Sequence, residues 1–336
     1  MDTGYSSWAA TAEALKSAAK TTAQTTGRDY DAALRMAYFD RLLSRVFHDS
    51  HRDRWVLKGG SGMLARVPDT RGTKDIDLAT SAGSIDEAEE ALINAASYDL
   101  GDHVYLEHVS SKPIIEADTQ PDVTGRRVMF ALIDAQKGKL IHQIPVDLVV
   151  EDGIVGHTDL INPASRLTLA KNLPSAPYRL YPLPDQVADK TTATVLPYHG
   201  RESSRVKDLV DLVVIARTQK VGIEPLRRAL SDRFESRGAN RPATFHAPTA
   251  WADRYSQMAS RVPACRGVED INTAENLVGT FVTPALTVSS SPTSAEWDPR
   301  YGWTVNPNGA VTPSPVDPMS RPPSPPAPDN PGPSRF

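Results

Sequence analysis

The sequence predicts an α+β protein in which a domain with a mixed sheet, at residues 29–162, precedes a helical domain at residues 163–283. Segments with the two-residue alternation of strands are concentrated before Asn162, and the apolar residues after it recur at helical spacing. Of the 28 prolines, 14 lie within residues 284–336. Proline-rich sequence favours extended polyproline conformations without a packed core, so we expect this segment to be a disordered tail.

The first half of the chain is predicted to mix helices with strands. Residues 1–28 are rich in Ala, Thr and Ser, and we expect them to form a mobile N-terminal arm, with a loose helix as the alternative. A helix is predicted next, because apolar side chains recur at helical spacing at Leu34, Ala37, Leu42 and Val46. Strands are expected at residues 55–57, 74–79, 104–107, 127–133 and 144–150, with one helix at residues 85–97.

The second half is predicted to be helical. Helices are expected at residues 185–196, 205–217 and 224–234, and residues 246–282 carry a weaker helical pattern. The two halves are each long enough to bury a core of their own, so the chain is expected to have two domains.

Composition excludes several classes of protein. The formal net charge is −4, from 37 Lys and Arg against 41 Asp and Glu, which does not fit a generic basic protein that coats nucleic acid. The one cysteine, Cys265, excludes an internal disulfide framework and a zinc-thiolate cluster. No stretch approaches 18 consecutive apolar residues, and charges at Glu13 and Lys16 interrupt the Ala-rich start. We therefore expect a cytoplasmic protein without a membrane partner.

One Asp-x-Asp pair is singled out by the residues that precede it. Such pairs occur twice, which is what chance predicts for 28 Asp in this chain, so the pattern alone carries little information. Asp75 and Asp77, however, follow a predicted strand that ends in a glycine turn at Gly60 and Ser61. Glycine lets a polyphosphate approach the backbone closely, and the N–H groups that follow, with the Ser61 hydroxyl, can donate hydrogen bonds to it.

Alternation along the strand puts Asp75 and Asp77 on one face, roughly 6.5–7 Å apart at the Cα atoms. Two carboxylates in this arrangement can share two Mg²⁺ ions, as phosphoryl and nucleotidyl transfer require. Asp147, a lone charge in an apolar strand, is the candidate third ligand. Two alternatives stay open: Asp147 can pair with an Arg at a strand edge, and the Asp75–Asp77 pair can be a solvated strand end.

Other phosphate and metal motifs are absent from the sequence. There is no GxxxxGK[ST] sequence, so a P-loop enzyme is excluded. The turn Gly60-Ser61-Gly62 is followed by Ala65 where a dinucleotide-binding fingerprint needs a third glycine. The eight His residues contain no HExxH pattern.

Two blocks of sequence resemble the AbiEii/AbiGii-type nucleotidyltransferase toxins, which belong to the DNA polymerase β-like nucleotidyltransferase superfamily. The first block is Trp55-Val56-Leu57-Lys58-Gly59-Gly60-Ser61 with Arg71-Gly72-Thr73-Lys74-Asp75-Ile76-Asp77-Leu78. The second is Ala188-Asp189-Lys190 with Arg205-Val206-Lys207-Asp208-Leu209-Val210-Asp211-Leu212. The resemblance covers about residues 30–235 and implies a polymerase β-like nucleotidyltransferase fold for the sheet domain.

The second block adds candidate residues for the nucleotide site. Lys190 can reach a triphosphate as a point charge. Asp208 and Asp211 are three residues apart on a predicted helix and therefore lie on one face. The resemblance implies that Lys190 and Asp211 take part in nucleotide binding and activity. An ion pair between Lys190 and an Asp that joins the two domains is the alternative.

Two further cations, Lys58 and Arg71, are expected to contact phosphate, although a simple salt bridge is an alternative for Arg71. Between Arg201 and Arg241 the segment contains ten Lys and Arg against six Asp and Glu. A local positive excess in a chain of negative net charge suits contact with an RNA backbone, but a solvated helix face has the same composition.

The resemblance implies a Mg²⁺-dependent nucleotidyltransferase that acts as the toxin of a bacterial toxin–antitoxin or phage-defence pair. It further implies an NTP substrate, transfer of nucleotides to the 3′ end of tRNA with a block of translation, and a cognate antitoxin as partner. The same fold can instead modify a small molecule or a protein. A nucleotide-binding module without turnover is a third possibility, although the presence of all three acids argues against it.

Overall fold

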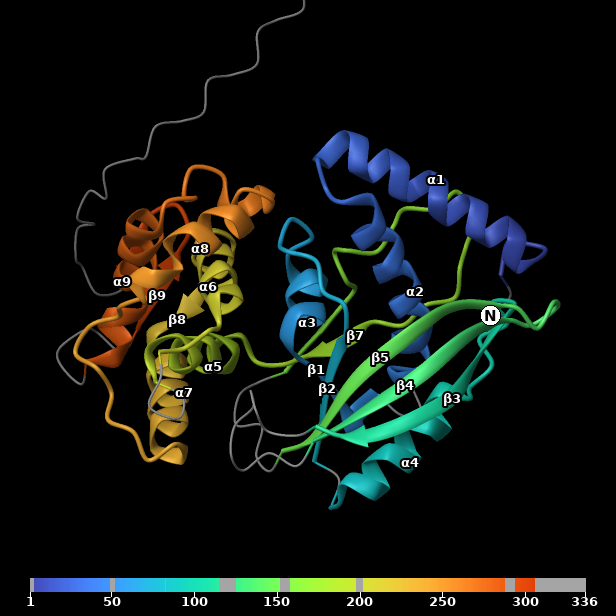
Figure 1. The fold of residues 1–336 in the computed structure, drawn as a ribbon, viewed down its shortest axis with the longest axis horizontal. Helices are drawn as coiled ribbons and strands as arrows, with labels where there is room; N and C mark the ends of the chain where they lie inside the picture. The colour runs from blue at the N-terminus through green and yellow to red at the C-terminus, as the bar shows by residue number, and fades with distance from the viewer. Residues whose placement is uncertain are drawn as a thin grey trace, which may run out of the picture.

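A seven-stranded mixed sheet forms the centre of the first part of the chain (Figure 1). The structure, a computed structural model, describes residues 3–48, 52–81, 83–114, 125–151, 158–197, 202–287 and 294–305. The strand order in the sheet is β3-β4-β5-β2-β1-β7-β6. These strands are β1 (Trp55–Leu57), β2 (Ile76–Thr80), β3 (Val104–Pro113), β4 (Gly125–Asp134), β5 (Leu140–Val150), β6 (Asp159–Ile161) and β7 (Tyr178–Leu180).

The register of the central strands lines up three charged residues. Strands β2 and β5 are parallel and place Asp77 beside Asp147, whereas β4 and β5 are antiparallel and place Arg127 beside Asp147. Paired residues on neighbouring strands point to the same face of a sheet. The side chains of Asp77, Asp147 and Arg127 therefore form a row across three strands on one face.

The opening residues form a packed helix, where we expected a mobile arm. Helix α1 (Trp8–Thr26) starts at Ser7, whose side chain caps it, and ends at Gly27 in the left-handed conformation, with φ of 74°. Leu15 and Ala19 are buried in the same core cluster as helix α2 (Tyr30–Val46). The prediction of a mobile arm was therefore wrong, and the alternative of a helix is confirmed, although this helix is packed rather than loose. The apolar residues of α1 are sparse, so the sequence does not show that they pack against α2.

The helix after β1 was not predicted. Helix α3 (Gly59–Arg66) begins within the glycine turn, although glycine is a poor helix former. Burial overrides this propensity, because Met63, Leu64 and Ala65 are almost fully enclosed. The helix predicted at 85–97 is present as α4 (Ile85–Ala96), and its capping box between Ser84 and Glu87 is formed.

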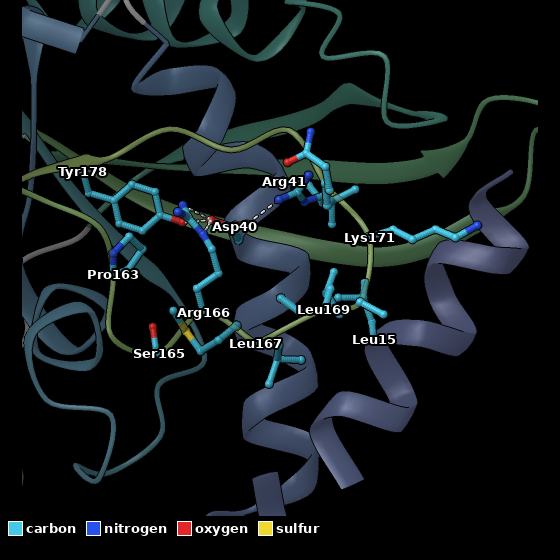
Figure 2. A pocket seen from close by; sticks show the side chains of 15 residues that line it. Leu15, Asp40, Arg41, Pro163, Ser165, Arg166, Leu167, Leu169, Lys171 and Tyr178 are labelled. Carbon is cyan, nitrogen blue, oxygen red and sulfur yellow. Dashed lines mark hydrogen bonds and ion pairs between the residues drawn. The ribbon is translucent and has the colours of Figure 1, made fainter. Parts of the chain in front are cut away.

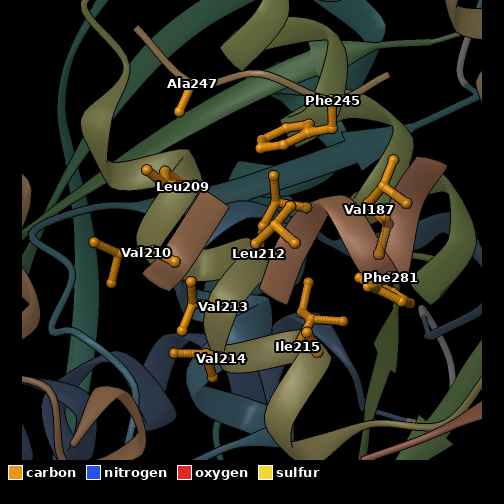
Figure 3. Close-up of a cluster of buried hydrophobic side chains, with 14 of the residues drawn as sticks. Val187, Leu209, Val210, Leu212, Val213, Val214, Ile215, Phe245, Ala247 and Phe281 are labelled. Carbon is orange, nitrogen blue, oxygen red and sulfur yellow. The ribbon is translucent and has the colours of Figure 1, made fainter. Parts of the chain in front are cut away.

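The second part of the chain is built around helix α6 (Val206–Thr218), which is buried on almost every side. Figure 3 shows its apolar side chains, among them Leu209, Leu212 and Ile215, packed with Phe245 and Phe281. The surrounding helices are α5 (Leu183–Val195), α7 (Ile223–Ser236), α8 (Ala252–Ala259) and α9 (Ile271–Leu286). No helix among the described residues has the length and hydropathy to cross a membrane.

Both boundaries of the helical domain differ from the prediction. Strands β6 and β7 belong to the first sheet, so the sheet domain extends past residue 162 to Leu180. Strands β9 (Ala295–Asp298) and β10 (Gly302–Val305) pair with β8 (Val221–Gly222) in a second sheet, so part of the expected tail is folded. Three-residue strands and a short hairpin give too little pattern to be found in sequence. Residues 306–336 of the predicted disordered tail lie outside the described residues.

Helix α2 carries buried charged residues that pair with side chains from other parts of the sheet domain. The Asp40 carboxylate on α2 accepts hydrogen bonds from Arg166 and Tyr178, and Arg41 pairs with both Asp40 and Asp102. Burial acts to raise the pKa of Asp40, but Arg41 and Arg166 lower it to about 2. A cavity of about 320 Å³ is lined in part by Asp40, Arg41, Arg166 and Tyr178 (Figure 2). None of the predicted site residues lines this cavity.

The hairpin β9–β10 should be needed for stability. Trp297 is buried, and its indole N–H donates to the carbonyl oxygen of Ala216 at 2.7 Å. A chain that ends at Thr287 loses this contact, and we expect its free energy of unfolding to fall by about 3–5 kcal/mol, the usual cost of removing a large buried aromatic side chain. A chain that ends at Val305 is the matched control and should unfold like the full chain in urea. Equal stability of both shortened chains would contradict the role of the hairpin.

Candidate active site

Three predicted carboxylates meet at one edge of the central strands. Asp75 directly precedes β2, Asp77 lies within it, and Asp147 lies beside Asp77 on β5. Burial first, and then the neighbouring charges of Asp75 and Asp147, raise the pKa of Asp77 to about 6. The three acids are thus close enough to repel one another, and the site favours a cation.

The third carboxylate is paired with an arginine, so the alternative that we left open for Asp147 is realised. Arg127 Nε and Nη2 donate to the two Asp147 oxygens at 2.6 and 2.7 Å. Arg127 Nη2 also lies 3.8 Å from Asp75 Oδ2. Within the described part of the chain, no three acid, His or Cys side chains are already arranged to hold a metal ion. Two acids at the start of β2 are thus candidate metal ligands, and the third acid, Asp147, is already paired with Arg127.

The glycine turn lies directly against the acids. A Cβ on Gly59 would come within 1.9 Å of Asp77 Oδ2, and Gly59 has a φ of +54°, so both space and backbone require glycine there. A Cβ on Gly60 would come within 2.8 Å of Thr73 Oγ1. No side chain caps the N-terminus of α3. Its first N–H groups are therefore available for an anion beside the acids.

Ser61 lies in this turn, but its side chain is fully buried. Its hydroxyl lies 3.3 Å from the carbonyl oxygen of Lys58, to which it donates, and it accepts from the backbone N–H of Asp77 at 3.4 Å. The Ser61 side chain thus joins the start of α3 to β2. The placement of the Ser61 hydroxyl does not support the prediction that it donates to a phosphate. The backbone N–H groups of the turn are the candidates for that contact.

Lys58 is held in a second group of charges. Its ammonium lies 2.6 Å from Glu151 Oε2 and 4.1 Å from the centre of the Tyr181 ring. Arg233 on α7 pairs with Glu151 at 2.8 Å and with Asp189 on α5 at 2.9 Å. This group links β1 and β5 to the helical domain. Glu151 and Arg233 were not found from the sequence, because each is an ordinary charge with no motif around it.

The four remaining predicted residues form one buried ion network. Lys190 Nζ lies 3.1 Å from Asp208 Oδ1 and 2.6 Å from Asp211 Oδ2. Arg71 reaches across from the loop before β2 and donates to both oxygens of Asp211, at 2.9 and 2.8 Å. The salt bridge that we left open for Arg71 is thus formed, and it joins the two domains. Lys190 also forms ion pairs, but with two acids of its own domain, so the alternative that it joins the domains is wrong.

Opposite charges maintain ionisation inside this network. Burial acts to lower the pKa of Lys190, but Asp211 and Asp208 raise it above its ordinary value. Burial acts to raise the pKa of Asp208, but Lys190 and Arg205 lower it to about 2. Arg205 Nε donates to Asp208 Oδ2 at 2.6 Å. A buried charge is stable only next to its partners, so the charged groups of this network are held in fixed positions.

Arg71 also faces the glycine turn. With Nε and Nη2 bound to Asp211, its Nη1 atom lies 3.6 Å from the position that a Cβ on Gly60 would take. Asp211 is fully enclosed. The geometry thus makes Asp211 a residue that orients Arg71 and Lys190, and it places one guanidinium nitrogen beside the N-terminus of α3.

Lys207 is a cation near the acids to which sequence analysis gave no role. It is exposed in the first turn of α6, and its positive charge acts to lower the pKa of Asp77. Lys207 stands within the quoted block Arg205-Val206-Lys207-Asp208, so the signal was present. Arg127 carried no such signal, because only the pairing of β4 with β5 brings it to Asp147.

The site combines a carboxylate pair beside a glycine turn with a buried Lys–Asp network in the adjoining helical domain, and the sequence blocks that carry these residues are the ones that resemble nucleotidyltransferases. The profile of the family described as "Nucleotidyl transferase AbiEii toxin, Type IV TA system" matches residues 41–274. The chain belongs to this family of toxin–antitoxin (TA) nucleotidyltransferases, which confirms the resemblance and the predicted fold class. No curated protein sequence matches the chain.

Ten chains of solved structures resemble this chain, and MenT4 and JHP933 are two of them. MenT4, a nucleotidyltransferase toxin from Mycobacterium tuberculosis H37Rv, is 17% identical with a TM-score of 0.45, and the match covers 80% of this chain and 97% of that one. JHP933 from Helicobacter pylori is 13% identical with a TM-score of 0.38, and the match covers 76% of this chain and 93% of that one.

Removal of the central cation of the buried network should be strongly destabilising. Lys190→Met leaves Asp208 and Asp211 enclosed with one cation fewer, and we expect a loss of about 3–5 kcal/mol in the free energy of unfolding. Lys207→Met removes the same charge from an exposed position and should change the stability by less than about 0.5 kcal/mol. Urea unfolding of both variants measures this difference, and equal losses would refute the network as a structural unit.

Removal of charge at Asp77 should stabilise the metal-free protein. The pKa of Asp77 in the folded state, about 6, lies above its ordinary value of 3.8. Between these two pH values the folded state binds more protons than the unfolded state, so the free energy of unfolding falls as pH rises. We expect Asp77→Asn to gain about 1–2 kcal/mol at pH 8 and to lose that gain by about pH 4. The measurement is urea unfolding in EDTA, with the exposed Asp232→Asn as control. A loss of stability at pH 8 would contradict the expectation.

Proposed function

We propose that the protein transfers nucleotides from an NTP to the 3′ end of tRNA, with Mg²⁺ as cofactor, and thereby blocks translation as the toxin of its antitoxin pair. Family membership supplies the reaction class and the toxin role. The observation that carries the proposal is the contact of the Asp77 carboxylate with Gly59 at the start of the glycine turn, with Asp75 two residues before Asp77. Nucleotidyl transfer needs carboxylates for a metal next to a backbone site for a triphosphate.

The donor set at β2 suits magnesium. Asp75 and Asp77 supply hard carboxylate oxygens, which are the ligands that Mg²⁺ takes in proteins. The missing Cβ of Gly59 makes room for the Asp77 carboxylate beside the turn. Asp75 and Asp77 would hold the ion, which would supply charge neutralisation for the triphosphate and activation of the acceptor hydroxyl. We propose Asp147 as the third ligand.

For the triphosphate we propose a site made by the first N–H groups of α3 and by two cations. Gly60 and the Ser61 backbone offer the N–H groups, and Arg71 Nη1 faces the same turn. Lys207 is exposed nearby and can approach a phosphate without breaking an enclosed ion pair. In this proposal Asp208, Lys190 and Asp211 act by fixing Arg71 and Arg205, which orients the cations before the nucleotide arrives.

The acceptor is proposed from the resemblance and from charge. The resemblance implies tRNA, and the excess of cations between residues 201 and 241 suits an RNA backbone. Several of these cations are engaged, for example Arg205 with Asp208 and Arg227 with Glu224. Lys207 and Arg228 are exposed and are the candidates for phosphate contact. Reaction with tRNA places the proposed activity in the cytoplasm.

The test is a transfer assay with total bacterial RNA, Mg²⁺ and each α-labelled NTP in turn. We expect label on a band of tRNA size with wild-type protein, and a loss of at least about a hundredfold with Asp75→Ala, because the metal loses one of its carboxylates. Asp232→Asn, an exposed change on α7, is the control and should keep full activity. Periodate treatment of the RNA, which destroys the 3′ diol, should abolish the labelling.

The outcomes separate the proposed acceptor from its rivals. Label on tRNA that requires both Asp75 and an intact 3′ end supports the proposal. Consumption of NTP without labelled RNA would overturn the RNA acceptor and favour a small molecule or a protein. Binding of nucleotide without consumption, in folded protein, would overturn catalysis itself.

A further inference from the structure

Arg127 lies where the acids of the site would otherwise repel one another. It is paired with Asp147 in the antiparallel register of β4 and β5, one strand away from Asp77. Two N–H groups of its guanidinium donate to Asp147 at 2.6 and 2.7 Å, and Nη2 lies 3.8 Å from Asp75. A single positive charge therefore stands between Asp75 and Asp147.

This position explains why the three acids are not already arranged around a common centre. The carboxylate of Asp147 directs both oxygens at Arg127. The side chain of Arg127 is 52% exposed, whereas that of Asp147 is 19% exposed. Arg127 can therefore turn out into solvent while Asp147 stays on its strand. Exposed ion pairs are weak, so the exchange of partners costs little.

We propose that Arg127 is a positioning residue, an internal counter-cation that competes with the divalent ion for Asp147. The inference rests on the proposed function, since it assumes a metal site at Asp75 and Asp77. In the metal-free protein Arg127 keeps the Asp147 carboxylate aligned. When a divalent ion enters, Arg127 releases Asp147 and its guanidinium is left beside the site, where a phosphate can accept its hydrogen bonds.

Charges on the other elements do not replace Arg127 in this role. Lys207 and Lys190 of the helical domain act to lower the pKa of Asp77. Arg205 of the same domain and Arg71 of the loop before β2 also lie near enough to interact with Asp77. Lys190, Arg71 and Arg205 are bound to Asp211 or Asp208. In the described part of the chain, the hydrogen bonds to the Asp147 carboxylate come from Arg127.

The neighbouring arginine provides a matched control. Arg126 precedes Arg127 on β4 and so points to the opposite face of the sheet, where it pairs with Glu89 and Asp86 of α4. Substitution of either arginine by Gln removes one positive charge from the same strand. Only Arg127→Gln removes it from the acids.

The experiment measures the affinity of the full chain for Mn²⁺ without nucleotide, by titration calorimetry and by the EPR signal of free Mn²⁺, at pH 8. We expect Arg127→Gln to bind Mn²⁺ about tenfold more tightly, because a competing cation is removed next to the ligands. Arg126→Gln should stay within about twofold of wild type, because its charge is distant and screened. In an Asp147→Asn background, Arg127→Gln should give a gain of about twofold or less.

Each result decides the inference. Unchanged or weaker Mn²⁺ binding by Arg127→Gln, with binding that still depends on Asp77, would overturn the role of Arg127 and leave the proposed function standing. An undiminished gain in the Asp147→Asn background would also overturn it, because the effect would then not pass through Asp147. Mn²⁺ binding that is indifferent to Asp77→Asn would overturn the metal site and this inference together.

Discussion

The carboxylate of Asp211 connects the two parts of the molecule and fixes the cations of the candidate site. It accepts from Lys190 within the helical domain and from Arg71 in the loop before β2. A fully buried carboxylate with two cationic partners is stable only if both stay in place. The orientation of Arg71 over the glycine turn, and so the electrostatics above the acids, depends on this one side chain.

The loop that carries Arg71 is held from both sides. Ala32, at the start of α2, lies where a side chain on Gly72 would make close contact. The carbonyl oxygen of Asp69 accepts a hydrogen bond at 3.3 Å from the backbone N–H of Ala264 in the helical domain. The start of α2 and the short helix Pro263–Cys265 thus support the same loop, although neither carries a predicted site residue. Their packing defines where Arg71 can stand.

The acids on the sheet illustrate how a binding site opposes stability. Asp75, Asp77 and Asp147 repel one another, and burial adds to the cost of charge on Asp77. A folded protein tolerates such repulsion where surrounding charges offset it, here Arg127 from β4 and Lys207 from α6. Under the proposed function, a divalent ion and a triphosphate would add charge of both signs to this group.

The sequence by itself determined the family of this protein and, with it, the class of reaction. The run from Lys58 to Ser61, the Asp75–Asp77 pair and the second block with Lys190 and Asp211 resemble the motifs of the family, and the family profile confirms the resemblance. The tertiary structure alone decided which charges meet. The pairing of Arg127 with Asp147, the turn of Lys58 toward Glu151 and the packing of α1 and the β9–β10 hairpin depend on contacts between residues distant in sequence, and local patterns of hydrophobicity and charge carry no information about such partners.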